Sequence, residues 1–132
     1  MIYVEGGTKS QKTYAYSMAD FVCNKFNIDA DIEIYFRSMT NDRSLGGCVQ
    51  VDQHEYEIDI KRGMKLRDML TTLAHELVHV KQYEAGELDH DAERDIEYWD
   101  KPSEIEAHGR EVGLFVRWAE QHNHAHKKWT QV

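Results

Sequence analysis

Two histidines and a glutamate in the run His75-Glu76-Leu77-Val78-His79 have the residue types and the spacing of a metal site. On a helix, residues i and i+4 lie about 40° apart on one face, so both imidazoles can reach the same ion. Glu76 then lies beside the ion, where its carboxylate can take a proton from an activated water and pass it to a leaving amine. The pattern predicts metal-assisted hydrolysis with His75 and His79 as ligands and Glu76 as the catalytic residue.

The residues around this motif have the pattern of a helix with one buried face, predicted over residues 65–84. Asp68, Thr72 and Gln82 share the face of the two histidines. Apolar residues recur at helical spacing on the opposite side: Leu66, Leu70, Leu73, Leu77 and Val80. We therefore expect the helix to bury its apolar stripe and to present the histidines to a cleft. Two surface histidines on a solvated helix would be the alternative, and the motif's position in mid-helix, opposite a clean apolar stripe, argues against it.

A catalytic zinc site has three protein ligands and leaves one position to water. A candidate third ligand lies in a second predicted helix, over residues 103–121. There Glu106 lies on the same helix face as Gly109 and Gly113. Two glycines would let this helix approach another backbone closely, so Glu106 is the favoured ligand. Glu104 is the alternative ligand; with Glu106 on the metal, Glu104 would accept a hydrogen bond from a ligand imidazole.

Other interpretations of these residues remain open. His90 or His108 is an alternative third ligand. The two glutamates also fit a helix N-terminus that is enriched in acidic residues because of the helix dipole.

The remaining elements indicate an α+β fold. A first helix is predicted over residues 10–26 with Ser10 as its N-cap, and short strands over 31–36, 47–51 and 56–60. The turn at 52–55 favours an antiparallel hairpin between the last two strands, and a loop is expected at 41–44 with Gly46 and Gly47. The prediction is an N-terminal helix, a small three-stranded, largely antiparallel sheet, the HExxH helix and a C-terminal glutamate helix, joined by a polar connection over 85–101.

Length and composition bound the function classes. The 132 residues fit one domain, with residues 122–132 as a flexible polar tail. The net charge of −8 argues against nucleic acid as a partner, because phosphate binding needs basic residues. No signal peptide or membrane span is visible, so we expect no membrane partner and a cytoplasmic location, with Cys23 and Cys48 as free thiols.

The segments HELVHVKQ and PSEIEAH resemble the gluzincin branch of the zincin metallopeptidases. The similarity covers about residues 64–116 and is greatest to the very short minigluzincins, with SprT-like proteins as more distant relatives. It implies one zinc per chain, bound by two histidines of one helix and a glutamate of the next, and the glutamate followed by alanine is Glu106. Larger gluzincins place an acid four residues after that glutamate, where this chain has Arg110. SprT-like proteins use a third histidine and often a zinc ribbon, and this chain has neither that spacing nor the ribbon's cysteines, so no DNA-linked role is implied.

The expected function is therefore that of a zinc metallopeptidase, with Glu76 as general base and then general acid. The oxyanion of the tetrahedral intermediate needs a donor, for which the candidates are Tyr83, Tyr98, His108 and Arg110. A peptide or protein substrate would add as an extended strand to the sheet edge beside the motif helix. The alternative is a catalytically silent or latent zinc-binding regulatory or interaction domain, in which the tail or the acidic connection blocks the cleft. The oligomeric state is left open.

Overall fold

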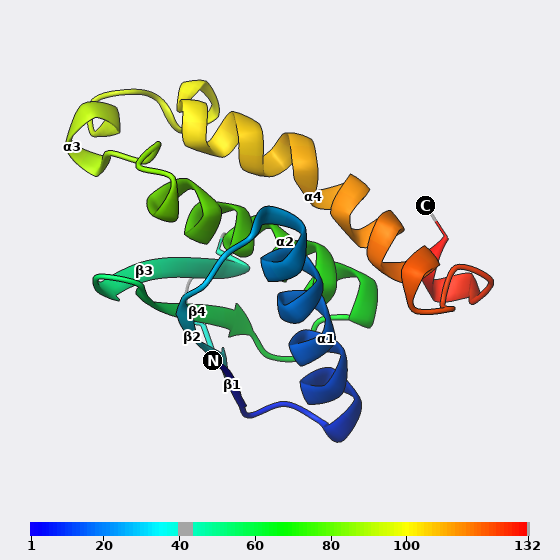
Figure 1. Ribbon diagram of the computed structural model, residues 1–132. Coiled ribbons are helices and arrows are strands. Elements are labelled where there is room, and N and C mark those ends of the chain that lie inside the picture. Colours follow the sequence, from blue (N-terminus) through cyan, green and yellow to red (C-terminus); the bar gives the residue numbers. More distant parts are fainter. Residues whose placement is uncertain (40–43, 132) are drawn as a thin grey trace.

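The computed structural model describes residues 1–39 and 44–131 and shows an α+β fold (Figure 1). The strands are β1 (Ile2–Glu5), β2 (Asp31–Arg37), β3 (Gly46–Asp52) and β4 (Glu55–Lys61). The helices are α1 (Lys9–Phe26), α2 (Leu66–Glu84), α3 (His90–Glu93) and α4 (Pro102–Gln121), with short 3₁₀ helices η1 (Tyr98–Asp100) and η2 (Lys128–Thr130). None of these helices is long and apolar enough to cross a membrane.

The described residues form a four-stranded mixed sheet in the order β1-β2-β4-β3. The predicted hairpin is confirmed, because β3 and β4 pair antiparallel. The expectation of a three-stranded, largely antiparallel sheet was wrong, since β1 pairs with β2 and β2 with β4 in parallel. β1 is only four residues long and gives no alternating pattern by itself. It is stabilised by pairing with β2 after α1 has crossed over between them.

Local capping fixes where the helices begin. Thr8, not the predicted Ser10, caps α1, and its side chain and that of Gln11 each accept a hydrogen bond from the other's backbone N–H. This capping box satisfies two N–H groups that would otherwise lack a partner. The helix therefore begins at Lys9, one residue before the predicted start. α4 begins at Pro102, as expected of a proline at the first helical position. Residues 41–43 of the predicted loop lie outside the described residues, and Gly46 and Gly47 begin β3.

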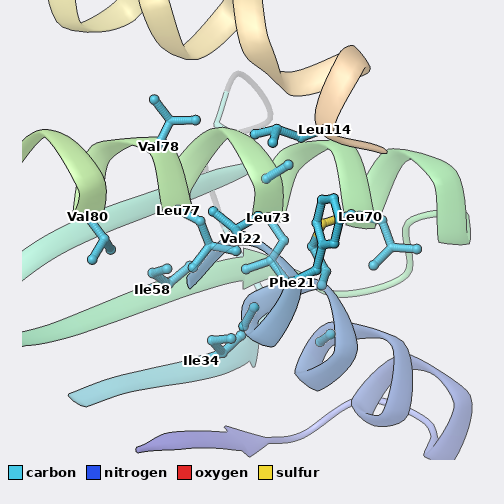
Figure 2. Packing of buried hydrophobic residues seen from close by; sticks show 14 of the residues in the cluster. Phe21, Val22, Ile34, Ile58, Leu70, Leu73, Leu77, Val78, Val80 and Leu114 are labelled. Carbon is cyan, nitrogen blue, oxygen red and sulfur yellow. The ribbon is translucent and has the colours of Figure 1, made fainter. Parts of the chain in front are cut away.

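Helix α2 is the central element, packed between the sheet with α1 on one side and α4 on the other (Figure 1). Figure 2 shows Leu73, Leu77 and Val80 directed toward the sheet and α1, whereas Val78 points to the opposite side, toward α4. All four side chains are fully buried. The apolar stripe predicted from the sequence thus faces the core, and burial on both sides leaves α2 little freedom to shift.

The chain after α4 packs onto the molecule as far as Gln131, where the sequence predicts a flexible tail. Trp129 lies against the core, with ring centroids 5.6 Å from Tyr14 and 6.4 Å from Trp118. Thr130 is buried and its hydroxyl donates to the carbonyls of residues 124 and 127. The segment is mostly polar, so its sequence did not indicate the large apolar surface that Trp129 contributes.

Candidate metal centre

His75, Glu76 and His79 lie in the middle of α2, at the bottom of a cleft. Their exposed fractions are 7%, 6% and 7%, although all three side chains are polar. The two imidazole centroids are 5.0 Å apart, and ligand-type atoms of the three residues lie within 4.8 Å of one another. The i, i+4 spacing therefore brings both rings to one point, as the sequence predicts.

The third side chain at this point is Glu104, from the first turn of α4. Its two carboxylate oxygens lie 2.9 Å from His75 Nε2 and 3.1 Å from His79 Nε2. One carboxylate thus bridges the two imidazoles. The sequence left Glu104 as the alternative to Glu106, and here Glu104 takes the position expected of the third ligand.

Glu106 does not contact the histidines. Its carboxylate lies 2.8 Å from Lys81 Nζ, 3.0 Å from Gln82 Nε2 and 2.8 Å from Arg110 Nε. Burial raises the pKa of Glu106, but these three donors outweigh it and lower the pKa to about 2. The arrangement does not support Glu106 as the third metal ligand.

The reasoning that favoured Glu106 also does not hold. None of the described residues lies within 4 Å of a Cβ built on Gly109 or Gly113, so these glycines make no close helix approach to them. A stripe of small residues on a sequence does not show which face of the helix meets its neighbour.

The Nδ1 atoms of both imidazoles are occupied by hydrogen-bond acceptors. His75 Nδ1 lies 3.2 Å from a carboxylate oxygen of Glu111, and His79 Nδ1 lies 2.8 Å from the amide oxygen of Gln82. These oxygens only accept hydrogen bonds, so both Nδ1 atoms must carry a proton. In the neutral tautomer, both Nε2 atoms then present lone pairs to the carboxylate of Glu104. These three acceptors can share a bound cation, or the two Nε2 atoms can be protonated and donate to Glu104.

The charge balance of the site supports the same conclusion. Burial alone would lower the pKa of His75, but its hydrogen bonds to Glu104 and Glu111 raise it to about 10. Burial would likewise raise the pKa of Glu104, whereas the bonds from His75, His79 and Tyr98 lower it well below its usual range. The surroundings therefore favour positive charge at the histidines, which a divalent ion can supply in place of protons. Two imidazole nitrogens and one carboxylate form a donor set that zinc accepts.

Glu76 lies against strand β3, and Gly46 makes room for it. A Cβ on Gly46 would lie 2.9 Å from Thr72 Cγ2 and 3.3 Å from a carboxylate oxygen of Glu76. A larger residue at position 46 would therefore push the strand away from α2. Burial raises the pKa of Glu76, opposed by the positive charges of His75 and His79. A carboxylate with a raised pKa is a more effective proton acceptor near neutral pH.

The cleft has a volume of about 620 Å³ and lies between β3, α2, the connection before α4, and α4 itself. Tyr98 reaches the site from η1, and its hydroxyl lies 3.0 Å from Glu104 and 2.9 Å from His108 Nε2. His108 Nδ1 in turn lies 2.7 Å from the oxygen of Glu111 that contacts His75. Tyr98 and His108 are thus the predicted donors that lie at the histidine site.

The other candidates lie further from it. Tyr83 lines the cleft, and its hydroxyl hydrogen-bonds to Nε2 of His90, which lines the cleft as well. Arg110 pairs with Glu106 and lies over the Phe26 ring. Cys48 also lines the cleft and, like Cys23, is free.

The sequence placed Gln82 on the face of the histidines but gave it no role, and Glu93 and Glu111 were not found from it. Glu111 follows Glu104 by seven residues, a spacing that returns to the same helix face and could have indicated it. Glu93 gives no such signal. Its buried carboxylate accepts hydrogen bonds from the backbone N–H and hydroxyl of Ser103, 3.0 and 2.6 Å away, and so anchors the turn that carries Glu104.

Comparisons of the chain with protein-family models, with curated proteins and with solved structures gave no match. The functional argument therefore depends on the geometry of this site.

Proposed function

We propose that the protein is a zinc-dependent metallopeptidase, with His75, His79 and Glu104 as the zinc ligands. The observation that carries this proposal is the convergence of both Nε2 atoms on the Glu104 carboxylate, 2.9 and 3.1 Å away, beside the carboxylate of Glu76. Three protein ligands next to an unused acid are typical of a catalytic zinc site, whereas structural sites use four protein ligands. The resemblance to gluzincins agrees with this function, with Glu104 in the role first expected of Glu106.

The reaction is hydrolysis of a peptide bond. Zinc in such a site lowers the pKa of a coordinated water to about 7 and polarises the scissile carbonyl. Glu76 takes a proton from the attacking water and delivers it to the departing amine. Tyr98 is the donor that can stabilise the developing oxyanion, because its hydroxyl lies beside Glu104 at the wall of the cleft. His108 can donate there only with Nε2 protonated, since the Glu111 carboxylate holds the proton on its Nδ1.

Strand β3 provides a binding edge for an extended substrate. It is the last strand of the described sheet, it pairs only with β4 there, and its residues from Val49 to Asp52 are exposed. Gly46, Gly47 and Cys48 of the same strand line the cleft. A peptide that adds to this edge would pass the histidines with its backbone hydrogen-bonded to β3.

The proposal predicts metal-dependent cleavage of an unstructured protein. Purified protein loaded with zinc is expected to cut a denatured casein-type substrate, measured by gel electrophoresis and mass spectrometry. A chelator should stop cleavage, and added zinc should restore it. Cleavage that continues at the same rate after the metal has been removed would contradict the proposal.

A further inference from the structure

The amide group of Gln82 is held in one orientation by two acceptors. Its Nε2 lies 2.9 Å from the backbone carbonyl oxygen of Ser103 and 3.0 Å from Oε1 of Glu106. A carbonyl and a carboxylate only accept hydrogen bonds, so both must face the NH₂ group. The amide oxygen is then left for His79 Nδ1, 2.8 Å away.

The orientation of this amide decides which nitrogen of His79 can bind a metal. With the oxygen toward the ring, Nδ1 carries the proton and Nε2 presents its lone pair toward Glu104. With the amide turned over, an NH₂ group would face Nδ1 and favour the opposite tautomer, in which Nε2 carries the proton and cannot coordinate. Gln82 is 2% exposed, so water cannot substitute for the lost acceptors.

Glu106 is itself fixed in place. Lys81 Nζ and Arg110 Nε each lie 2.8 Å from its Oε2, which leaves Oε1 directed at Gln82. Both cations also lie over the Phe26 ring, at 5.9 and 5.2 Å. Oε2 of Glu106 is therefore held by the two cations, and Oε1 accepts the hydrogen bond from Gln82.

We propose that Glu106 is a positioning residue for the metal centre, which acts through Gln82 to hold His79 in the tautomer that binds metal. The inference rests on the proposed zinc site, but it does not require peptidase activity. It gives Glu106 a role without placing it on the metal, and it explains why a carboxylate with two cationic partners also reaches toward a buried amide.

A double-mutant cycle tests this role with zinc affinity as the readout. Zinc dissociation constants would be measured by competition with a chromogenic chelator for wild type, Gln82→Ala, Glu106→Ala and the double variant. We expect each single substitution to weaken binding about 10-fold. The double variant should be no weaker than Gln82→Ala alone, because Glu106 acts through Gln82.

Matched controls separate this role from a loss of fold or charge. Glu120→Ala makes the same change on the same helix, at a carboxylate that is ion-paired with Arg117 and does not line the cleft, and should leave zinc affinity unchanged. Glu106→Gln keeps an acceptor oxygen and should restore most of the affinity lost in Glu106→Ala. In the zinc-loaded wild type, proton NMR should show a His79 Nδ1–H that exchanges slowly with water, and exchange should quicken in Glu106→Ala but not in Glu120→Ala.

The possible failures are distinguishable. Wild-type affinity in Glu106→Ala, or single effects that multiply in the double variant, would overturn the positioning role and leave the zinc site intact. A wild type that binds no zinc would overturn the proposed site and this inference together.

Discussion

Replacing Glu76 by glutamine is expected to lower the rate of peptide hydrolysis by about 10²- to 10⁴-fold, the range that a general base contributes. Glutamine has nearly the same shape but cannot take a proton from water. Glu76 is not among the proposed ligands, so zinc affinity should stay near that of the wild type. The rate would be measured on a fluorogenic peptide under single-turnover conditions, together with the zinc content of each sample.

Asp68→Asn provides a matched control for this substitution. It makes the same chemical change on the same helix, at an exposed position that does not line the cleft of Glu76. Its rate should equal that of the wild type. A Glu76→Gln protein that is fully active would refute the proposed mechanism, and one that has lost its zinc would place Glu76 among the ligands.

Removing residues 122–132 is expected to destabilise the fold and not to release activity. The segment covers Trp118 with Trp129, and the Arg67 guanidinium donates to the carbonyl of Gln131, which ties the segment to α2. Trp129→Ala alone should lower the free energy of unfolding by about 2 kcal/mol, below the 3–5 kcal/mol typical of a fully buried tryptophan. Urea denaturation followed by circular dichroism would measure both variants.

The control for this effect is Lys128→Ala in the same 3₁₀ helix, where the exposed side chain should contribute less than about 0.5 kcal/mol. No residue after Gln121 lines the cleft in the part of the chain that the structure describes. A truncated protein that is stable and more active than the full chain would instead show that the tail keeps the enzyme latent.

Elements with a strong local pattern could be predicted from the sequence, and those that depend on tertiary pairing could not. The leucine stripe of α2 and the turn before Glu55 identify the motif helix and the hairpin, because both patterns are local. β1 exists only through its parallel pairing with β2, and the position of Trp129 depends on aromatic side chains far away in the chain. Neither contact leaves a periodic signal in its own segment.

In the candidate site, too, one part follows from a local pattern and another part depends on tertiary packing. The i, i+4 geometry of a helix determines that His75 and His79 share a face, so their convergence follows from sequence alone. The choice between Glu104 and Glu106 depends on how α4 is rotated against α2. These two residues lie about 200° apart around the helix, so only one of them can face the histidines. That rotation is set by packing, which the spacing of the glycines did not reveal.

Metal content of untagged protein is the most direct test of the proposed centre. Wild type, Glu104→Gln and Glu106→Gln would be purified, reconstituted with zinc, desalted and analysed by inductively coupled plasma mass spectrometry. We predict about one zinc per chain in the wild type and in Glu106→Gln, and its loss in Glu104→Gln, because Glu104, and not Glu106, contacts both imidazoles. Zinc lost only in Glu106→Gln would contradict the assignment of the third ligand, and a wild type without zinc would contradict the metal centre itself.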